Sequence, residues 1–251
     1  MPWTTFAYSG SLNTASLTAF AGVADQTVRV QTNDILIPTG FTELIGAYYG
    51  GTTATIAQLQ SPSILRRYPL ALGRTDASAT PSGPLIPYNS FVTQPIALDA
   101  SEALQFFGAN TAAGAQTMKG VIDVGDGNYG LTAGEIFTIR TTSATTLVAN
   151  AWTTCALTFP NNLPFGNYVV AGMRAESATG ICARVVFTGT SFARPGAICV
   201  NTANEVDLDT YRMGARGDWG SFASVTPPTI EVLATAADTA EVFYLDLIKA
   251  G

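Results

Sequence analysis

The second half of the chain repeats the order of strands and turns found in the first half. Four short segments of the first half have counterparts in the second, with little identity between them. Thr55-Ile56 is matched by Gly180-Ile181, Ile37-Pro38 by Phe159-Pro160, Arg66-Arg67-Tyr68-Pro69 by Phe192-Ala193-Arg194-Pro195, and Thr111-Ala112-Ala113 by Thr235-Ala236-Ala237. The repeat predicts two fused modules of roughly 125 residues each, close to the usual size of a domain. It also predicts that Ile56 and Ile181 occupy equivalent core positions.

The boundary between the modules is expected in the run Asp123 to Gly130, which consists mostly of residues typical of turns. We therefore place the first module at residues 1–126 and the second at residues 127–251.

The dominant hydrophobic period along the chain is two, which is typical of β-strands. Segments rich in Val, Ile, Thr, Tyr and Phe are bounded by Gly, Pro, Asn and Ser. We expect strands at Phe41 to Tyr49, Thr55 to Gln60, Leu104 to Phe107, Tyr168 to Met173, Ile181 to Phe187, Thr229 to Leu233 and Val242 to Ile248. Short helices are expected only at Asp99 to Leu104, where Asp99 and Glu102 fit a capping box, and around Asn204 to Tyr211.

Each module offers about eight strand candidates, which is the strand count of a jelly roll. An immunoglobulin-like sandwich has about seven strands in fewer residues. The fold class predicted is all-β, with two tandem eight-stranded jelly-roll modules related by an internal repeat.

The composition points to a protein that buries apolar surface against other subunits. Charged residues make up 12% of the chain, against about 25% in a typical soluble protein. No stretch approaches the ~20 apolar residues that span a bilayer, so subunit contacts are the expected destination for this surface. The net charge is −6 and no block of basic residues occurs, so direct nucleic-acid binding is not expected. The N-terminal residues lack the features of a secretory signal peptide.

The chain contains no histidine, which excludes Ser-His-Asp triads, Cys-His dyads and histidine metal ligands. Lys119 and Lys249 lie in strand-like or terminal sequence, and no carboxylate pair stands out. We expect no catalytic residues, no cofactor and no metal site. Cys155, Cys182 and Cys199 are odd in number and lack a C-x-x-C pair, so buried thiols are favoured over disulfides or zinc ligands.

Three groups of residues have both a binding and a structural interpretation. Asp123, Asp126 and Asn128, and separately Glu205, Asp207 and Asp209, resemble calcium ligands or solvated turns. Arg216-Gly217-Asp218 is either an integrin-type tripeptide or a plain turn. Trp3, Trp152 and Trp219 fit a carbohydrate-binding platform or core and interface packing. The structural interpretation is favoured in each case.

Arg66, Arg67 and Arg194 precede matched prolines in the two modules. Arginine is the usual charged residue of protein interfaces because its fork pairs with carboxylates and stacks on rings. We expect these three arginines at inter-module or inter-subunit contacts, and charge reversal at Arg194 to block assembly.

A histidine-free chain rich in Thr, Ala and Gly, with two tandem eight-stranded modules, resembles the double jelly-roll major capsid proteins of icosahedral viruses and phages. The resemblance extends from about Phe6 to Lys249 and rests on architecture, since the family has no sharp signature motif. It implies homotrimers that act as pseudo-hexagonal capsomers and contact neighbouring capsomers, vertex or minor capsid proteins and, in many members, an internal membrane. It also implies synthesis in the host cytoplasm and residence in the capsid shell of the virion.

Two other functions fit the same sequence. A phage or bacterial surface protein with two β-sandwich modules would bind glycans or mediate adhesion. A capsid-decorating or spike protein would share the modules but bind an existing shell.

Overall fold

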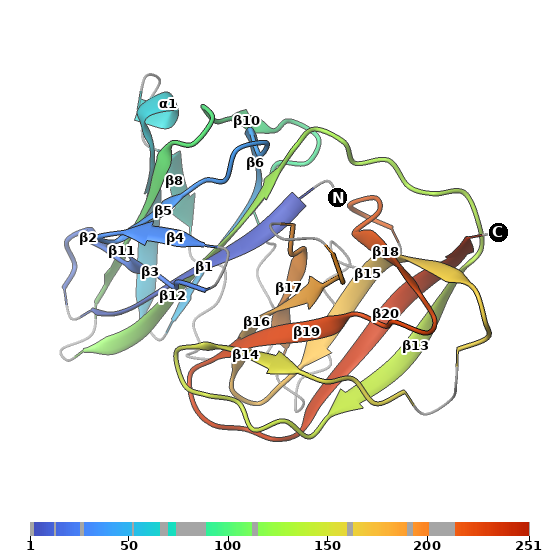
Figure 1. Cartoon of the computed structure of the whole chain (residues 1–251). Helices are drawn as coiled ribbons and strands as arrows, with labels where there is room; N and C mark the ends of the chain where they lie inside the picture. The colour runs from blue at the N-terminus through green and yellow to red at the C-terminus, as the bar shows by residue number, and fades with distance from the viewer. Residues whose placement is uncertain are drawn as a thin grey trace. The chain divides into compact units, whose positions relative to one another are not determined.

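In the computed structural model of the chain, regular secondary structure is almost entirely β-strand (Figure 1). The described residues are 3–12, 14–25, 28–51, 53–65, 70–73, 89–111, 115–159, 163–189, 193–200 and 214–250. They form two compact units. The first unit comprises Thr5–Asp126, and the second comprises residues 127–250 together with Trp3 and Thr4.

The first unit contains two antiparallel sheets. Its strands are β1 (Trp3–Leu12), β2 (Thr18–Ala19), β3 (Ala21–Gly22), β4 (Arg29–Gln31), β5 (Asp34–Leu36), β6 (Glu43–Gly51), β7 (Ala54–Gln60), β8 (Leu70–Gly73), β9 (Asn89–Ser90), β10 (Ile96–Ala97), β11 (Ala103–Asn110) and β12 (Gln116–Gly125). One sheet has the order β10-β6-β12-β1-β3 and the other β4-β5-β11-β7-β8. A short helix, α1 (Pro62–Leu65), follows β7.

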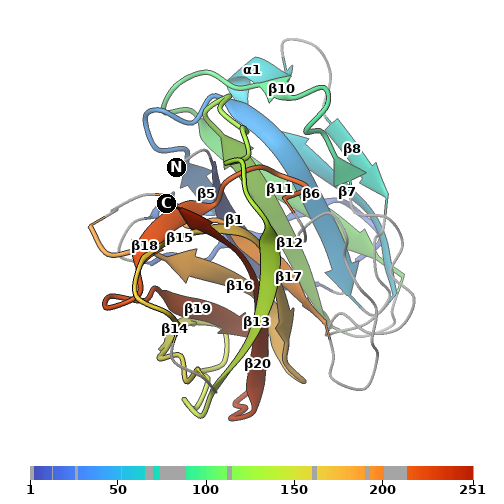
Figure 2. The same ribbon diagram turned by 90° about the vertical axis from the view of Figure 1, so that its right-hand side faces the viewer.

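The described residues of the second unit form eight strands, of which β13, β20 and β15 run side by side (Figure 2). They are β13 (Ile136–Ser143), β14 (Trp152–Cys155), β15 (Asn167–Glu176), β16 (Gly180–Val186), β17 (Gly196–Val200), β18 (Gly220–Ala223), β19 (Thr229–Ala234) and β20 (Glu241–Ala250). One sheet is β13-β20-β15-β18 and the other β14-β19-β16-β17. A short parallel pairing of β15 with β17 joins the two sheets at one end.

The two units have the same strand order. In each, the first, eighth, third and sixth main strands form one sheet, and the second, seventh, fourth and fifth form the other. In the first unit these main strands are β1, β5, β6, β7, β8, the β9–β10 pair, β11 and β12, while β2, β3 and β4 are short additions. This order is that of a jelly roll. The predicted fold class of two tandem eight-stranded jelly rolls is therefore confirmed, and the seven predicted strands are all present.

Aromatic side chains fill the space between the sheets of the first unit. Tyr8, Phe20 and Tyr49 surround Phe106, with ring centroids 5.4 to 6.1 Å from it. Gly120 on β12 allows this packing, because a Cβ there would lie 2.6 Å from the Phe106 ring. The burial of such rings is the main stabilising contribution in a core of this kind.

The predicted equivalence of Ile56 and Ile181 is wrong. Ile56 is 42% exposed, whereas Ile181 is fully buried. Strand β7 buries Ala57 and Leu59, so Ile56 lies on the opposite, accessible face. Strand β16 is buried along nearly its whole length, so an isoleucine there does not indicate which face points to the core.

The helix predicted at Asp99 to Leu104 is also wrong, although its capping interaction is present. The backbone N–H of Asp99 donates to the Glu102 carboxylate over 3.0 Å. Ser101 has a φ of 60°, which is left-handed and ends the turn before a helix can continue. Strand β11 begins at Ala103. The second predicted helix, Asn204 to Tyr211, lies outside the described residues.

A buried aspartate on the last strand of each jelly roll marks the equivalent positions of the two units. In the first unit Asp123 on β12 accepts a hydrogen bond from the Thr5 hydroxyl over 2.6 Å and pairs in register with Gly46. In the second unit Asp246 on β20 accepts one from Thr138 over 2.6 Å and pairs with Gly172. A β-bulge lies beside each of these pairs. The carboxylate, hydroxyl and glycine therefore recur together on the eighth, first and third strands.

The exposure of the two threonines differs, which predicts unequal effects of the same substitution. Thr5 is buried and Thr138 is exposed. We expect Thr5→Val to lower the free energy of unfolding by about 1–3 kcal/mol, because the buried Asp123 carboxylate loses a donor. Thr138→Val should cost less, because water can replace the hydroxyl. Urea unfolding of both variants measures the difference, and equal losses would contradict it.

Candidate functional site

Arg194 lies in a buried ion-pair cluster of the second unit. Its Nη1 atom is 2.6 Å from each carboxylate oxygen of Glu231, and its backbone N–H donates to the Thr4 hydroxyl over 3.1 Å. The residue is 8% exposed. Its predicted role at an inter-module or inter-subunit contact stays a prediction. Arg66 and Arg67, predicted for the same role, lie outside the described residues.

A second arginine shares the same carboxylate. Arg184 on β16 is the cross-strand partner of Glu231 on β19, and its Nη2 atom lies 2.5 Å from Glu231. The Arg184 guanidinium is stacked 3.6 Å from the centre of the Trp152 ring on β14. The cluster therefore connects adjacent strands of one sheet through charge and ring stacking. Sequence reasoning missed it because Glu231 and Arg184 are far apart in the chain.

Removal of the shared carboxylate is expected to destabilise the second unit. Glu231→Gln leaves two largely buried guanidinium groups facing a neutral amide, and we expect a loss of about 3 kcal/mol in unfolding free energy. The matched control is Glu176→Gln, which breaks the more accessible Arg174–Glu176 pair and should cost less than about 1 kcal/mol. Urea unfolding measures both. Wild-type stability of the Glu231 variant would contradict the role given to the cluster.

The Arg216-Gly217-Asp218 segment is a structural turn. Arg216 is buried, with its guanidinium 5.1 Å from the centre of the Trp3 ring. Asp218 accepts hydrogen bonds from the backbone N–H and the hydroxyl of Thr132. Gly217 has a φ of 74°, and a Cβ there would overlap the Tyr129 carbonyl. The predicted plain turn is confirmed.

The three tryptophans pack inside the second unit. Trp3 and Trp219 are fully buried and contact each other edge to face, with ring centroids 4.8 Å apart. Trp152 is covered on one face by Arg184. These rings do not form an exposed platform for sugar stacking, so the packing interpretation is confirmed.

The three residues of the predicted acidic turn, Asp123, Asp126 and Asn128, differ in their exposure to solvent. Asp123 is buried within β12, whereas Asp126 is half-buried and Asn128 is exposed after it. Glu205, Asp207 and Asp209 lie outside the described residues. Among the residues that are described, no group of three or more His, Cys, Asp or Glu side chains is placed to hold a metal ion.

The three cysteines are buried thiols, as predicted. Burial raises the pKa of Cys155 to about 11, and the nearby carboxylate of Glu241 adds to this effect. The thiol is therefore protonated at neutral pH and a poor nucleophile.

Glu241 is a fully buried carboxyl at the start of β20, opposite Ser143 on β13. Burial raises its pKa from 4.5 to about 7, with a contribution from the negative charge of Asp238. Below pH 4.5 the group is protonated in both the folded and unfolded states. Between pH 4.5 and 7 only the folded state keeps the proton, so stability falls as the pH rises.

Glu241→Gln is expected to remove this pH dependence. The variant should match the wild type near pH 4 and exceed it by about 3 kcal/mol at pH 8, since each unit of pKa shift corresponds to about 1.4 kcal/mol. Urea unfolding across this pH range is the measurement. If the difference in unfolding free energy between the variant and the wild type were the same at pH 4 and pH 8, the assignment would be wrong.

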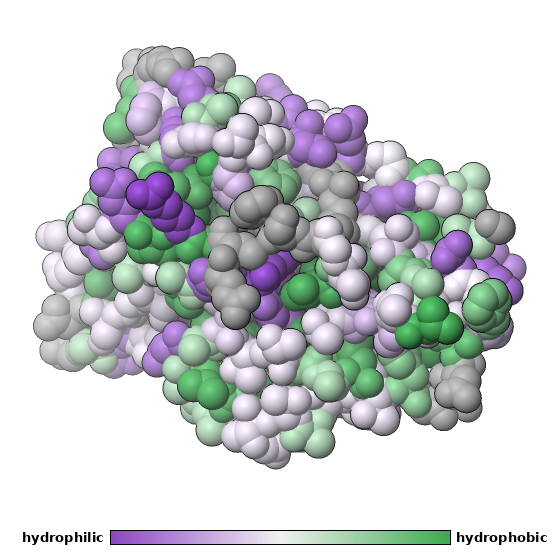
Figure 3. Space-filling view, in the orientation of Figure 1, coloured by the Kyte–Doolittle hydropathy of each residue, from purple (hydrophilic) through white to green (hydrophobic). Residues whose placement is uncertain are grey.

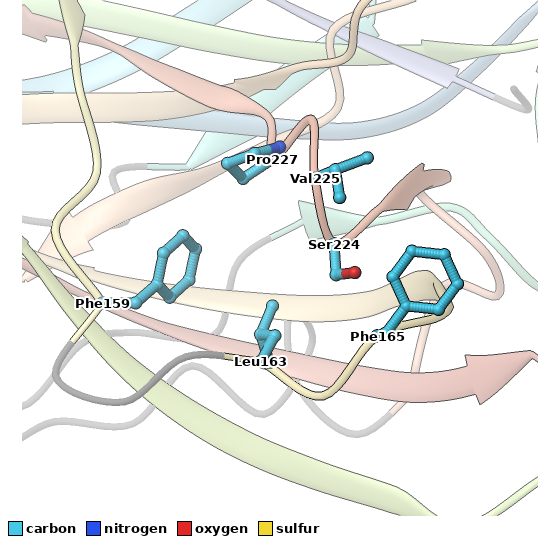
Figure 4. Close-up of a pocket in the computed structure, with 6 residues that line it drawn as sticks. All are labelled: Phe159, Leu163, Phe165, Ser224, Val225 and Pro227. Atoms are coloured by element: carbon cyan, nitrogen blue, oxygen red, sulfur yellow. The ribbon is translucent and has the colours of Figure 1, made fainter.

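An apolar hollow of about 420 Å³ lies at one end of the second unit. Figure 4 shows Phe159 and Leu163 facing Val225 and Pro227 on the turn after β18. Phe165 is 86% exposed and Val225 is 70% exposed. Large apolar side chains this exposed are typical of surfaces that another molecule covers. Sequence periodicity did not predict this hollow, because it is built mainly from loop residues.

Figure 3 shows one face of the molecule, coloured by the hydropathy of its residues. In the face shown in Figure 3, strongly hydrophilic side chains form small groups among weakly polar and hydrophobic ones. None of the helices in the described part of the chain has the length and apolarity needed to cross a membrane.

Comparison with known proteins gives one structural likeness. No protein-family model matches the chain, and no curated protein matches it. A solved structure to which the chain is similar is that of the major capsid protein P2 from bacteriophage PM2. It is 13% identical to this chain, with a TM-score of 0.25, and the match covers 99% of this chain and 98% of that protein.

Proposed function

We propose that this protein is a structural major capsid protein, not an enzyme, and that three copies form a pseudo-hexagonal capsomer of an icosahedral virion. The observation that carries the proposal is the recurrence of one jelly-roll strand order in both units. A trimer of a duplicated module presents six similar units around its axis. The duplication thus gives three chains the tiling geometry of a hexamer.

The surface supports a role in assembly. The apolar hollow around Phe165 and Val225 would be covered when copies associate, and the low charge of the chain suits extensive subunit contacts. The burial of Trp3 and Trp219 removes the aromatic platform that a glycan-binding function would need. In this proposal the protein resides in the virion shell, where its partners are neighbouring capsomers, vertex or minor capsid proteins and, in some shells, a membrane.

The test is the mass of the native species by multi-angle light scattering. We expect a species of three times the 26.2 kDa chain mass, or a closed particle visible by electron microscopy. The double variant Phe165→Ser, Val225→Ser should reduce the associated fraction at least several-fold, because it removes apolar area from the contact. Leu17→Ser, at a less exposed leucine of the first unit, is the control. A wild-type monomer at physiological salt would contradict the proposal.

A further inference from the structure

The carboxyl group of Glu241 lies in the interior at one end of the second jelly roll. Along β20, Glu241 and Phe243 are buried, whereas Val242 and Tyr244 are half-buried, so Glu241 points between the two sheets. Its cross-strand partner on β13 is Ser143. A carboxyl group in such a position is costly to ionise unless it is paired or well hydrogen-bonded.

The groups that face Glu241 do little to stabilise its ionised form. Neither of its carboxyl oxygens completes a hydrogen bond with a described residue. Burial raises its pKa to about 7, and the negative charge of Asp238 adds to the increase, while the Ser177 hydroxyl opposes it. From β14 in the opposite sheet comes the Cys155 thiol, whose pKa is raised by burial and by the charge of Glu241. Asp238 and Cys155 are thus the titratable groups that face this carboxyl.

The charged residues of the neighbouring strands point to the other face of the sheet. Arg140 on β13 and Arg174 on β15 both pair with Tyr244, and Glu176 on β15 pairs with Val242. Directly paired residues share a face, and this face is opposite to the one that carries Glu241. None of these three charges therefore reaches the interior position.

Three loops begin at the strand ends beside Glu241. We call them the loop cluster: residues 144–151 between β13 and β14, 177–179 between β15 and β16, and 235–240 between β19 and β20. Loops joined mainly by hydrogen bonds can open at a lower free energy than the sheets that they connect.

Hydrogen bonds at Asp238 join the three loops. Its carbonyl accepts the N–H of Leu147 over 2.8 Å, and its carboxylate accepts the N–H of Ala178 over 3.1 Å. The carbonyl of Thr179 also accepts the N–H of Thr235 over 2.9 Å. The residue that holds the loop cluster together is therefore the one whose charge opposes ionisation of Glu241.

We propose that the loop cluster is a proton-controlled gate, which is closed over Glu241 while its carboxyl is protonated and opens as the proton is lost, exposing the Cys155 thiol to solvent. Opening lets water hydrate the carboxylate and relieves its repulsion with Asp238. The inference goes beyond the proposed function and does not depend on the association of copies, because every group involved belongs to the second unit of one chain.

Proton linkage gives the direction of the pH dependence. In the closed form the pKa of Glu241 is about 7, and in the open form the hydrated carboxyl returns to its ordinary pKa of 4.5. Between these two pH values only the closed form keeps the proton. The equilibrium constant for opening therefore rises on the order of a hundredfold across this range and is level below and above it.

Thiol labelling of the native protein measures the opening at Cys155. Pulses of dithiodipyridine, which reacts with thiols even at acid pH, are followed by peptide mass spectrometry to locate the labelled cysteines. Each rate is divided by the rate of the denatured chain at the same pH, which removes the intrinsic pH dependence of the thiol. We expect the corrected Cys155 rate to rise at least about tenfold from pH 5 to pH 7 and to level off by pH 8. Cys182, buried within β16, should be labelled at least about tenfold more slowly at each pH, because it waits for global unfolding.

Two variants separate the contributions of the two carboxyl groups. Glu241→Gln keeps a neutral side chain of similar shape, so its corrected Cys155 rate should not rise with pH. Asp238→Asn keeps an acceptor for the Ala178 N–H but removes the charge that raises the pKa of Glu241, so the rise should be smaller. Circular dichroism checks that both variants are folded.

Either of two results would overturn the inference. Equal corrected rates for Cys155 and Cys182 would mean that the thiol is reached only by global unfolding, and an undiminished rise in Glu241→Gln would assign the pH dependence to another group. Amide hydrogen exchange of the wild type gives a check that needs no variant. After correction for intrinsic rates, the N–H of Leu147 should lose protection between pH 5 and pH 7, and the N–H of Val185, bonded to the Pro195 carbonyl, should stay better protected.

Discussion

The closure of each jelly roll depends on pairing between its first and last strands. Strand β12 lies between β1 and β6, and β20 lies between β13 and β15. The eighth strand therefore occupies the middle of its sheet although it comes last in its unit. In both units this strand carries a buried aspartate bound by a threonine of the first strand. The hydrogen bond fixes the register of a pairing that joins residues more than a hundred positions apart.

The fold class followed from the sequence because two signals agreed. The period-two patterns gave the strands, and the order of turn residues showed that the two halves resemble each other. The residue-level register did not follow, as Ile56 and Ile181 show. An isoleucine in a strand indicates a buried face only where the opposite face is polar, and β16 is buried on nearly every residue. The Thr5–Asp123 and Thr138–Asp246 pairs mark the register better, but only their contacts across strands identify them.

The functional surface was harder to predict than the fold, for a physical reason. Arg194 was a candidate interface residue and Arg216 part of a candidate recognition tripeptide, yet both are buried, with Arg194 engaged by Glu231 and Arg216 by Trp3. A buried arginine needs partners from distant strands, and the sequence does not show which strands become neighbours. Glu241 is an ordinary residue in the sequence, and only the fold places it inside the unit, opposite Ser143.

The position of the eighth strand also determines when each unit can fold during synthesis. The first jelly roll has its central strand once Gln116–Gly125 has left the ribosome, while the whole second unit is still to be made. The second lacks the middle of its sheet until Glu241–Ala250 has emerged. Until then β13 and β15 have unpaired edges, which favour association with other chains. A nascent chain would thus carry one finished module and one open module until β20 has emerged.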